Sequence, residues 1–212
     1  MKTSYCIGIP TINRADLLNE SLKRYFIDFS TIHILIVDNG NQEIITRPEL
    51  FEIHRPEENC VSASWNYLMK RGHELGYKRV LILNDDVYLG GNRIDIGKII
   101  KAYYHADLIK GTKDFCVFIL TVFAHQMYGK FDENFKPAYF EDNDFLYRLK
   151  LAGAYVITTE LLDPEIYRNS MTIMKDRSLN DNFQKNQDYY ISKWGNLPNK
   201  ETFKEPFIDP KI

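Results

Sequence analysis

The sequence predicts an α/β protein whose mostly parallel central sheet is flanked by helices within a single domain. Short, continuous apolar runs alternate along the chain with segments whose apolar residues recur at helical spacing. Strands that are apolar on both faces are typical of a parallel sheet covered by helices on both sides. The length of 212 residues suits one domain, because single domains usually hold roughly 100–250 residues.

Three buried strands are predicted in the first half of the chain. The first covers residues 5–9 and is expected to end at Pro10, which has no N–H to donate to a sheet. The second covers residues 32–37 and is followed by the turn-forming segment 38–40, with the sequence Asp-Asn-Gly. The third covers residues 80–83 and is apolar throughout.

Two helices are expected between these strands, because apolar residues there recur every three or four positions. Asn13 can cap the first helix, and Ser62 opens the second. The residues expected to face the sheet are Leu17, Leu18, Leu22 and Phe26 in the first helix, and Val61, Trp65, Leu68 and Met69 in the second.

The second half of the chain has a different pattern. Residues 115–123 form a very apolar, strand-like run, residues 141–152 have helical spacing, and residues 155–158 return to a strand pattern. We therefore expect one domain over residues 1–162. Residues 163–212 are polar and are interpreted as a C-terminal extension packed on the same domain, wrapping its surface or becoming ordered only with a ligand.

Charge and cysteine content exclude several classes of function. The net charge is −2 and the pI is near 6.2, so no overall positive field attracts nucleic acid or an anionic membrane. The longest apolar stretch, 116–124, is about half of the roughly 20 residues that a membrane span needs. Cys6, Cys60 and Cys116 lack metal-ligand spacing and fit a reducing environment. We expect a soluble, cytoplasmic protein with no membrane span.

Polar residues gather where the predicted strands end. Ligands of open α/β sheets bind beyond the carboxyl ends of the strands, so we expect these residues to line one site. They are Pro10, Thr11, Ile12, Asn13 and Arg14 after the first strand, Asp38 and Asn39 after the second, Asn84, Asp85 and Asp86 after the third, and Glu141 and Asp142 after a later strand and loop.

The segment Asn84-Asp85-Asp86 follows the third predicted strand directly. Two neighbouring carboxylates repel each other, and each is stabilised by water or a cation. Hard divalent ions bind oxygen ligands and commonly keep waters and substrate phosphates, so one or two protein carboxylates can suffice. An Asx turn that ends the strand explains the same residues without a ligand. The local pattern leaves both interpretations open.

Acidic residues also begin the helix predicted from Glu141. Acids in a first turn are favoured by the helix dipole, and Asp144 can form an ion pair with Arg148 four residues later. The functional alternative is that Glu141 or Asp142 faces the cleft as a general base. Locally, the structural explanation accounts for these residues without any catalytic role.

Five segments, in order, resemble the family 2 glycosyltransferases and related enzymes of the GT-A fold over roughly residues 4–155. They are IGIPTINR at 7–14, VDNGN at 37–41, ENCVSASWN at 58–66, LNDDV at 83–87 and GKFDENFKPAYFEDNDFLYRLKLAG at 129–153. The resemblance implies a GT-A nucleotide-sugar-binding and catalytic domain over residues 1–162. The compact size also resembles catalytic domains of larger glycosyltransferases, including virus-encoded ones.

The resemblance assigns a role to each matching residue. Pro10, Thr11 and Arg14 would line the nucleotide pocket, Asp38 would bond the base, Asn66 or Asn59 would hold the nucleotide, Asn84 and Asp85 would face the ribose or sugar, Asp86 would bind the metal, and Asp142 would be the base with Glu141 beside it. The implied cofactor is Mn²⁺ or Mg²⁺.

Two departures from the family pattern affect the expected metal site. Asn84 stands where the first Asp of the family's acidic triplet is usual, and no histidine follows His125, although many relatives bring a late histidine to the metal. Residues 167–169 occupy that region instead. The resemblance therefore implies coordination by Asp86, the nucleotide diphosphate and water.

The resemblance implies an inverting, metal-dependent glycosyltransferase. The expected donor is a UDP-sugar, either UDP-glucose or a related hexose or deoxyhexose such as rhamnose, and the expected partner is a glycan or glycoprotein acceptor. Two alternatives remain: a non-catalytic module that binds a nucleotide-sugar or glycan, and a nucleotidyltransferase. A nucleotidyltransferase would carry a Gly-rich, Lys-bearing loop after the first strand, and residues 10–14 contain neither residue. The sequence does not indicate an oligomeric state.

Overall fold

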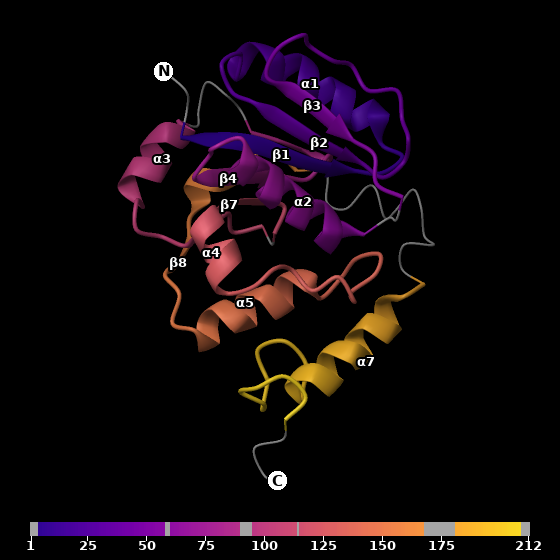
Figure 1. Ribbon diagram of the computed structural model, residues 1–212, viewed down its shortest axis with the longest axis vertical. Coiled ribbons are helices and arrows are strands. Elements are labelled where there is room, and N and C mark those ends of the chain that lie inside the picture. The colour runs from indigo at the N-terminus through magenta and orange to yellow at the C-terminus, as the bar shows by residue number, and fades with distance from the viewer. Residues whose placement is uncertain (1–3, 58–59, 90–94, 114, 168–180, 209–212) are drawn as a thin grey trace.

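A computed structural model describes residues 4–57, 60–89, 95–113, 115–167 and 181–208 (Figure 1). Its centre is a seven-stranded sheet with the strand order β3-β2-β1-β4-β7-β6-β8. These strands are β1 (Tyr5–Thr11), β2 (Ile34–Asp38), β3 (Phe51–His54), β4 (Arg79–Leu83), β6 (Leu108–Lys110), β7 (Val117–Thr121) and β8 (Val156–Thr158). Only β7 runs antiparallel to its neighbours. The predicted α/β class with a mostly parallel sheet is confirmed.

Helices cover both faces of this sheet. They are α1 (Ala15–Asp28), α2 (Val61–Glu74), α3 (Ile96–Ala102), α4 (Val122–Met127), α5 (Glu141–Leu151), the 3₁₀ helix η1 (Glu160–Leu162) and α7 (Phe183–Trp194). A small antiparallel sheet pairs β5 (Val87–Tyr88) with β9 (Ile166–Tyr167). Figure 1 shows α1 on one side of the large sheet, α2 and α5 on the other, and α7 beyond α5. None of the helices in the described part of the chain has both the length and the apolar composition of a membrane span.

Alternation along the strands divides the apolar core between the two faces. In β1, Ile7 and Ile9 belong to the cluster that contains Leu22 of α1. Cys6, which precedes Ile7, belongs to the cluster that contains Leu68 of α2. Since neighbouring strand residues point to opposite faces, a strand that is apolar at every position stabilises the packing of helices on both sides.

The prediction that Pro10 ends the first strand is wrong, because β1 continues through it for one more residue. The N–H of Ile7 donates to the carbonyl of His33 beside β2, at 2.8 Å. Bonding directions alternate along a strand, so the nitrogen of residue 10 points to the β4 side. There β4 pairs with β1 only as far as Gly8. Proline at this position therefore removes no hydrogen bond from the sheet.

Two further boundaries differ from the prediction. Asn13 does not cap α1: it has a φ of 52°, and Arg14 is the N-cap residue, with no side-chain cap bond. The apolar run 115–123 is not one strand, because Thr121 ends β7 and its Oγ1 accepts a hydrogen bond of 2.9 Å from the Ala124 N–H. This cap begins α4 within an apolar run that gives no sign of a change in period.

The C-terminal segment contributes a helix that the sequence pattern did not predict. Tyr190 and Trp194 of α7 are buried, and they form a third apolar cluster with Phe135, Phe140 and Tyr147. The large aromatic side chains of α7 therefore pack against residues near the start of α5. The boundary at residue 162 stays a prediction.

Gly8 lets α2 lie close to the centre of the sheet. A Cβ atom at this position would lie 2.9 Å from Cδ1 of Ile82 and 3.2 Å from Cβ of Leu68. The Leu68 Cβ is fixed by the α2 backbone and cannot rotate away. The close approach also sets the position of the first turn of α2, which lies near the candidate site.

Gly8→Ala is expected to lower the free energy of unfolding by roughly 1–3 kcal/mol, because the added methyl overpacks the contact between β1 and α2. Urea denaturation followed by circular dichroism measures the change. Gly97→Ala in α3 is the matched control, since its Cβ would meet only the Asp95 carboxylate at 3.2 Å, and it should change stability by less than about 1 kcal/mol. Equal stability of Gly8→Ala and the wild type would contradict the close approach.

Candidate functional site

The carboxyl ends of β1, β2 and β4 bring three of the expected site residues together. Thr11 pairs with Asp38 in the parallel register of β1 and β2. Its Oγ1 donates a hydrogen bond of 2.8 Å to Oδ2 of Asp85, which follows β4. All three residues are buried, and Pro10 is half-buried next to Thr11. The shared ending of the parallel strands thus places an acidic, hydrogen-bonded cluster at one edge of the sheet.

The Asp38 carboxylate organises the loop that follows β2. Oδ1 accepts hydrogen bonds of 3.0 Å from the Gly40 N–H and from Nε2 of Gln42. Oδ2 accepts bonds from the Gln42 N–H at 2.8 Å and from Nε of Arg55 at 3.2 Å. The Arg55 side chain is 46% exposed, so it is the donor that a nucleobase N–H could replace most readily. Base recognition by Asp38 stays a prediction.

Arg14 lies at the end of β1 with a buried and incompletely paired guanidinium. Its Nε and Nη2 donate to the two carboxylate oxygens of Asp16, at 3.0 and 3.1 Å. Its Nη1 is also buried and has no hydrogen-bond partner among the described residues. A buried donor without a partner is costly, and an anionic or carbonyl group of a ligand would stabilise it.

Asp86 is buried beside a small surface pocket. The pocket is lined by Glu20, Ser21, Arg24, Asp85, Asp86, Val87, Tyr88 and Ile166. Among the described residues, no group of three or more His, Cys, Asp and Glu side chains could hold a metal ion. The oxygen donors of Asp85 and Asp86 suit a hard divalent cation only if other ligands, such as phosphate and water, complete its coordination. Asn84 precedes them and is half-buried.

The first turn of α2 connects this edge to the second acidic group. Nδ2 of Asn39, directly after β2, donates to Oγ of Ser64 at 3.1 Å, and that hydroxyl donates to the Cys60 carbonyl at 2.8 Å. The next N–H, of Val61, donates to the Pro137 carbonyl at 2.9 Å. Residues 136–144, which we call the 136–144 corner, are thereby held next to the carboxyl edge of the sheet.

The 136–144 corner carries both expected catalytic carboxylates. Glu141 is buried, and its Oε2 has no hydrogen-bond partner among the described residues. Burial and the charge of neighbouring Asp142 raise the pKa of Glu141 well above its ordinary value. Asp142 is half-buried, and its Oδ1 accepts two bonds of 2.7 Å from Asn143. The two carboxyl groups are adjacent in sequence but differ in their environments.

Asn66 uses its whole side-chain amide within the protein. Nδ2 donates to the Phe131 carbonyl and to Oε1 of Glu133, at 2.9 and 2.8 Å. Oδ1 lies 2.9 Å from both the Phe131 nitrogen and Nε2 of His125. His125 is buried, which lowers its pKa to about 4. Asn66 therefore joins α2 to α4 and to the segment before α5, and its contact with a nucleotide stays a prediction.

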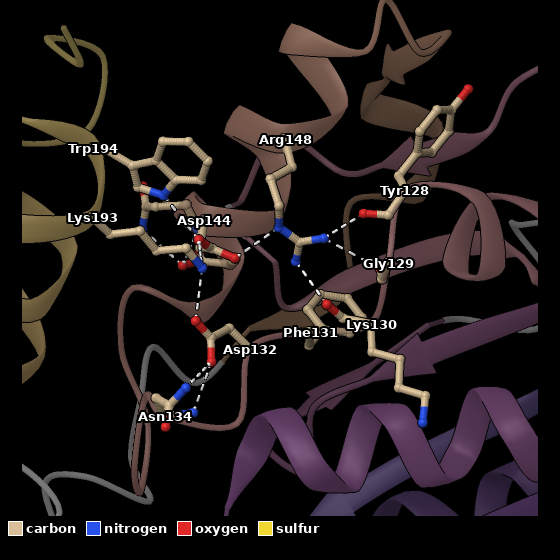
Figure 2. A network of polar contacts seen from close by, with 12 residues as sticks. Tyr128, Gly129, Lys130, Phe131, Asp132, Asn134, Asp144, Arg148, Lys193 and Trp194 are labelled. Carbon is tan, nitrogen blue, oxygen red and sulfur yellow. Dashed lines mark hydrogen bonds and ion pairs between the residues drawn. The ribbon is translucent and has the colours of Figure 1, made fainter. Parts of the chain in front are cut away.

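Figure 2 shows a buried ionic network behind the 136–144 corner. Asp144 is fully buried and accepts hydrogen bonds from Nε of Arg148 at 3.0 Å and from Nε1 of Trp194 at 2.9 Å. Nζ of Lys193 lies 2.7 Å from both Asp144 and Asp132. The predicted pair of Asp144 with Arg148 is confirmed.

Arg148 also anchors the chain before the corner. Its guanidinium donates to the carbonyls of Tyr128, Gly129 and Lys130. The structural role expected for Arg148 agrees with these contacts.

Several residues at the site were not predicted from the sequence. Gln42 contacts Thr11 and Asp38 and accepts a hydrogen bond from the first N–H of α1, and Lys193 pairs with Asp144. Gln42 lies beyond the recognisable turn, and Lys193 lies about fifty residues after its partner, so no local pattern indicates either contact. Asn59, Arg168 and Asn169, which the sequence also suggested, lie outside the described residues.

Solved structures with a similar fold are glycosyltransferases. TarS of S. aureus, residues 1–349, has a TM-score of 0.58 and 15% identity over 90% of this chain and 64% of that one. Its complex with UDP-GlcNAc has a TM-score of 0.56 and 13% identity, covering 74% and 56%. GalNAc-T7 with UDP, GalNAc and Mn²⁺ has a TM-score of 0.59 and 10% identity, covering 89% and 50%. The chain therefore has the GT-A fold, as the resemblance implied.

These similarities concern the fold, because all three identities are low. The chain spans between half and just under two thirds of the length of these proteins. No protein-family model and no curated protein sequence matches the chain.

The raised pKa of Glu141 predicts a specific dependence of stability on pH. A carboxyl group whose pKa is higher in the folded state stabilises the fold below its unfolded pKa of about 4.3, and that stability is lost as pH rises through the folded pKa. Glu141→Gln should therefore be more stable than the wild type at pH 8 and about equally stable at pH 4. Urea denaturation at both pH values measures the free energy of unfolding of each protein. If Glu141→Gln and the wild type differ in this free energy by the same amount at pH 4 and at pH 8, the pKa of Glu141 is not raised in the folded protein.

Proposed function

We propose that this protein is a metal-dependent glycosyltransferase that transfers a sugar from a UDP-sugar to a glycan hydroxyl with inversion. The observation that supports this most is the pair of acidic groups on one side of the sheet. One group, Thr11, Asp38 and Asp85 with Asp86, lies at the carboxyl ends of the strands. The other, Glu141 and Asp142, belongs to the 136–144 corner, and hydrogen bonds through the first turn of α2 link this corner at Pro137 to Asn39 after β2.

The first group would bind the nucleotide. The unpaired Nη1 of Arg14 can donate to a phosphate or base oxygen. Asp38 can accept a hydrogen bond from the imide N–H of uracil in place of the bond from Arg55. Adenine has no imide N–H and could not donate this bond. Thr11 fixes the orientation of Asp85, whose second oxygen would face the ribose or sugar.

Asp86 would hold a divalent ion, Mn²⁺ or Mg²⁺, together with the nucleotide diphosphate and water. Such an ion supplies positive charge that stabilises the leaving diphosphate. The similar structure of GalNAc-T7 contains Mn²⁺ and UDP, which supports the same class of cofactor here.

Asp142 would remove the proton from the acceptor hydroxyl. Burial raises the pKa of Glu141 well above its ordinary value and so favours its protonated form, in which only one of the two adjacent carboxyl groups carries a charge. The half-buried Asp142 is the member of the pair with access to solvent and to an acceptor. Because the base and the leaving diphosphate act in one displacement, the configuration of the sugar would be inverted.

A panel of UDP- and dTDP-sugars tests this proposal directly. Release of UDP from at least one UDP-sugar is expected in the presence of Mn²⁺ and should stop when EDTA is added. Binding without release of diphosphate would instead indicate a non-catalytic module. Release of pyrophosphate from UTP and a sugar phosphate would indicate a nucleotidyltransferase, and either result would overturn the proposal.

Asp142→Asn should reduce turnover by roughly 10²–10⁴-fold, which is the usual loss when a positioned base is removed. The affinity for UDP should change little, because proton removal belongs to the transition state. Steady-state kinetics and calorimetry separate the two effects, with the exposed Asp188→Asn as the matched control. Near-normal turnover of Asp142→Asn would exclude it as the base, and loss of UDP binding would make it a ligand of the donor.

A further inference from the structure

The 136–144 corner has a backbone that its own sequence does not favour. Tyr139 and Phe140 both have left-handed conformations, with φ of 81° and 71°. Neither residue is glycine, and such conformations are unfavourable for other residues unless the surroundings hold them. The first helical hydrogen bond of α5 then runs from the Asp144 N–H to the Phe140 carbonyl, at 2.9 Å. Glu141 and Asp142 lie within this single turn.

Helix α7 contacts the corner at three successive points. Nδ2 of Asn186 donates to the carbonyls of Lys136 and Ala138, at 3.3 and 2.7 Å, before the left-handed pair. The rings of Phe183 and Tyr190 pack on Phe140 at centroid distances of 5.3 and 5.6 Å.

The third contact closes the turn that holds the two carboxylates. Lys193 and Trp194 both bind Oδ1 of Asp144, at 2.7 and 2.9 Å. Figure 2 shows these side chains approaching Asp144 from α7, while Arg148 approaches from within α5. The network contains two acidic groups, Asp132 and Asp144, and two basic groups, Arg148 and Lys193, so its formal charges balance.

We propose that Lys193 and Asn186 of α7 are positioning residues that fix the 136–144 corner and so place Asp142 for proton removal. This inference rests on the proposed function. It assigns a catalytic purpose to a helix that contacts the 136–144 corner. The helix acts through Asp144 and the corner backbone, since a misplacement of about 1 Å can cost roughly 100-fold in rate.

Lys193→Met tests the inference, because it removes the ammonium group and keeps much of the side-chain volume. UDP release from UDP-glucose in Mn²⁺ should show kcat lower by roughly 10–100-fold and KM changed by less than about threefold. Calorimetric affinity for UDP should stay at the wild-type value, because the sheet edge is intact. Lys185→Met, at an exposed position of the same helix, is the control and should leave both constants unchanged.

A second pair of variants separates positioning from stability. Asn186→Ala removes a different contact with the 136–144 corner and should lower kcat in the same way. If Lys193→Met does not fold, this variant tests the positioning role on its own. Lys193→Met combined with Asp132→Asn restores the charge balance of the network. The melting temperature of this double variant should recover, and its kcat should remain low.

Three outcomes would count against this account in different ways. Wild-type kcat in folded Lys193→Met or Asn186→Ala would overturn the positioning role alone. Recovery of kcat together with melting temperature in the double variant would reduce Lys193 to a stabilising residue. Absence of UDP release by the wild type would overturn the proposed function, and with it the inference.

Discussion

Strands β2, β1 and β4 lie side by side and run in the same direction, so their carboxyl ends meet at one edge of the sheet. Each of these strands is followed by a polar segment, and the hydrogen bond between Thr11 and Asp85 joins the first to the third. A one-residue shift of β1 against its neighbours would turn Thr11 away from Asp85. The apolar alternation that fixes the register therefore also fixes the geometry of the candidate donor site.

The acidic first turn of α5 depends on a second constraint. Its position is fixed by contacts with segments that are far away in the sequence. The 136–144 corner contains two left-handed residues in a row and leads into a turn with three carboxylates. It is held from one side by the first turn of α2 and from the other by α7. The buried Asp144 and the half-buried Asp132 are paired with Lys193, and Asp144 also with Arg148. A buried charge without a partner is strongly destabilising. The C-terminal helix is therefore joined to the candidate site by charge as well as by packing.

The sequence was sufficient for the parts of the fold with strong local periodicity. Strands β1, β2 and β4, helices α1 and α2, and the gathering of Thr11, Asp38 and Asp85 all follow from apolar runs that end in polar turns. Strand β3 was not predicted. The five segments in family order predicted the GT-A fold, which the similar structures confirm.

Other features could not be predicted from local patterns. The proline in β1 is tolerated because β4 ends earlier, which depends on the neighbouring strand. The start of α4 lies within an apolar run where strand and helix are equally buried. Gln42 and Lys193 form tertiary contacts that no local sequence pattern predicts. The roles of Asp38, Asn66 and Asp86 in ligand binding stay predictions, because they concern groups outside the protein chain.

We propose that the carboxyl edge of the sheet binds a uridine diphosphate group together with a divalent metal ion. Calorimetric titration of UDP into the wild type and into Asp86→Ala, each with Mn²⁺ and with EDTA, tests this binding. We expect saturable binding by the wild type that weakens in EDTA, and binding by folded Asp86→Ala that no longer responds to Mn²⁺. An affinity for UDP that is the same in both proteins and in both conditions would contradict it.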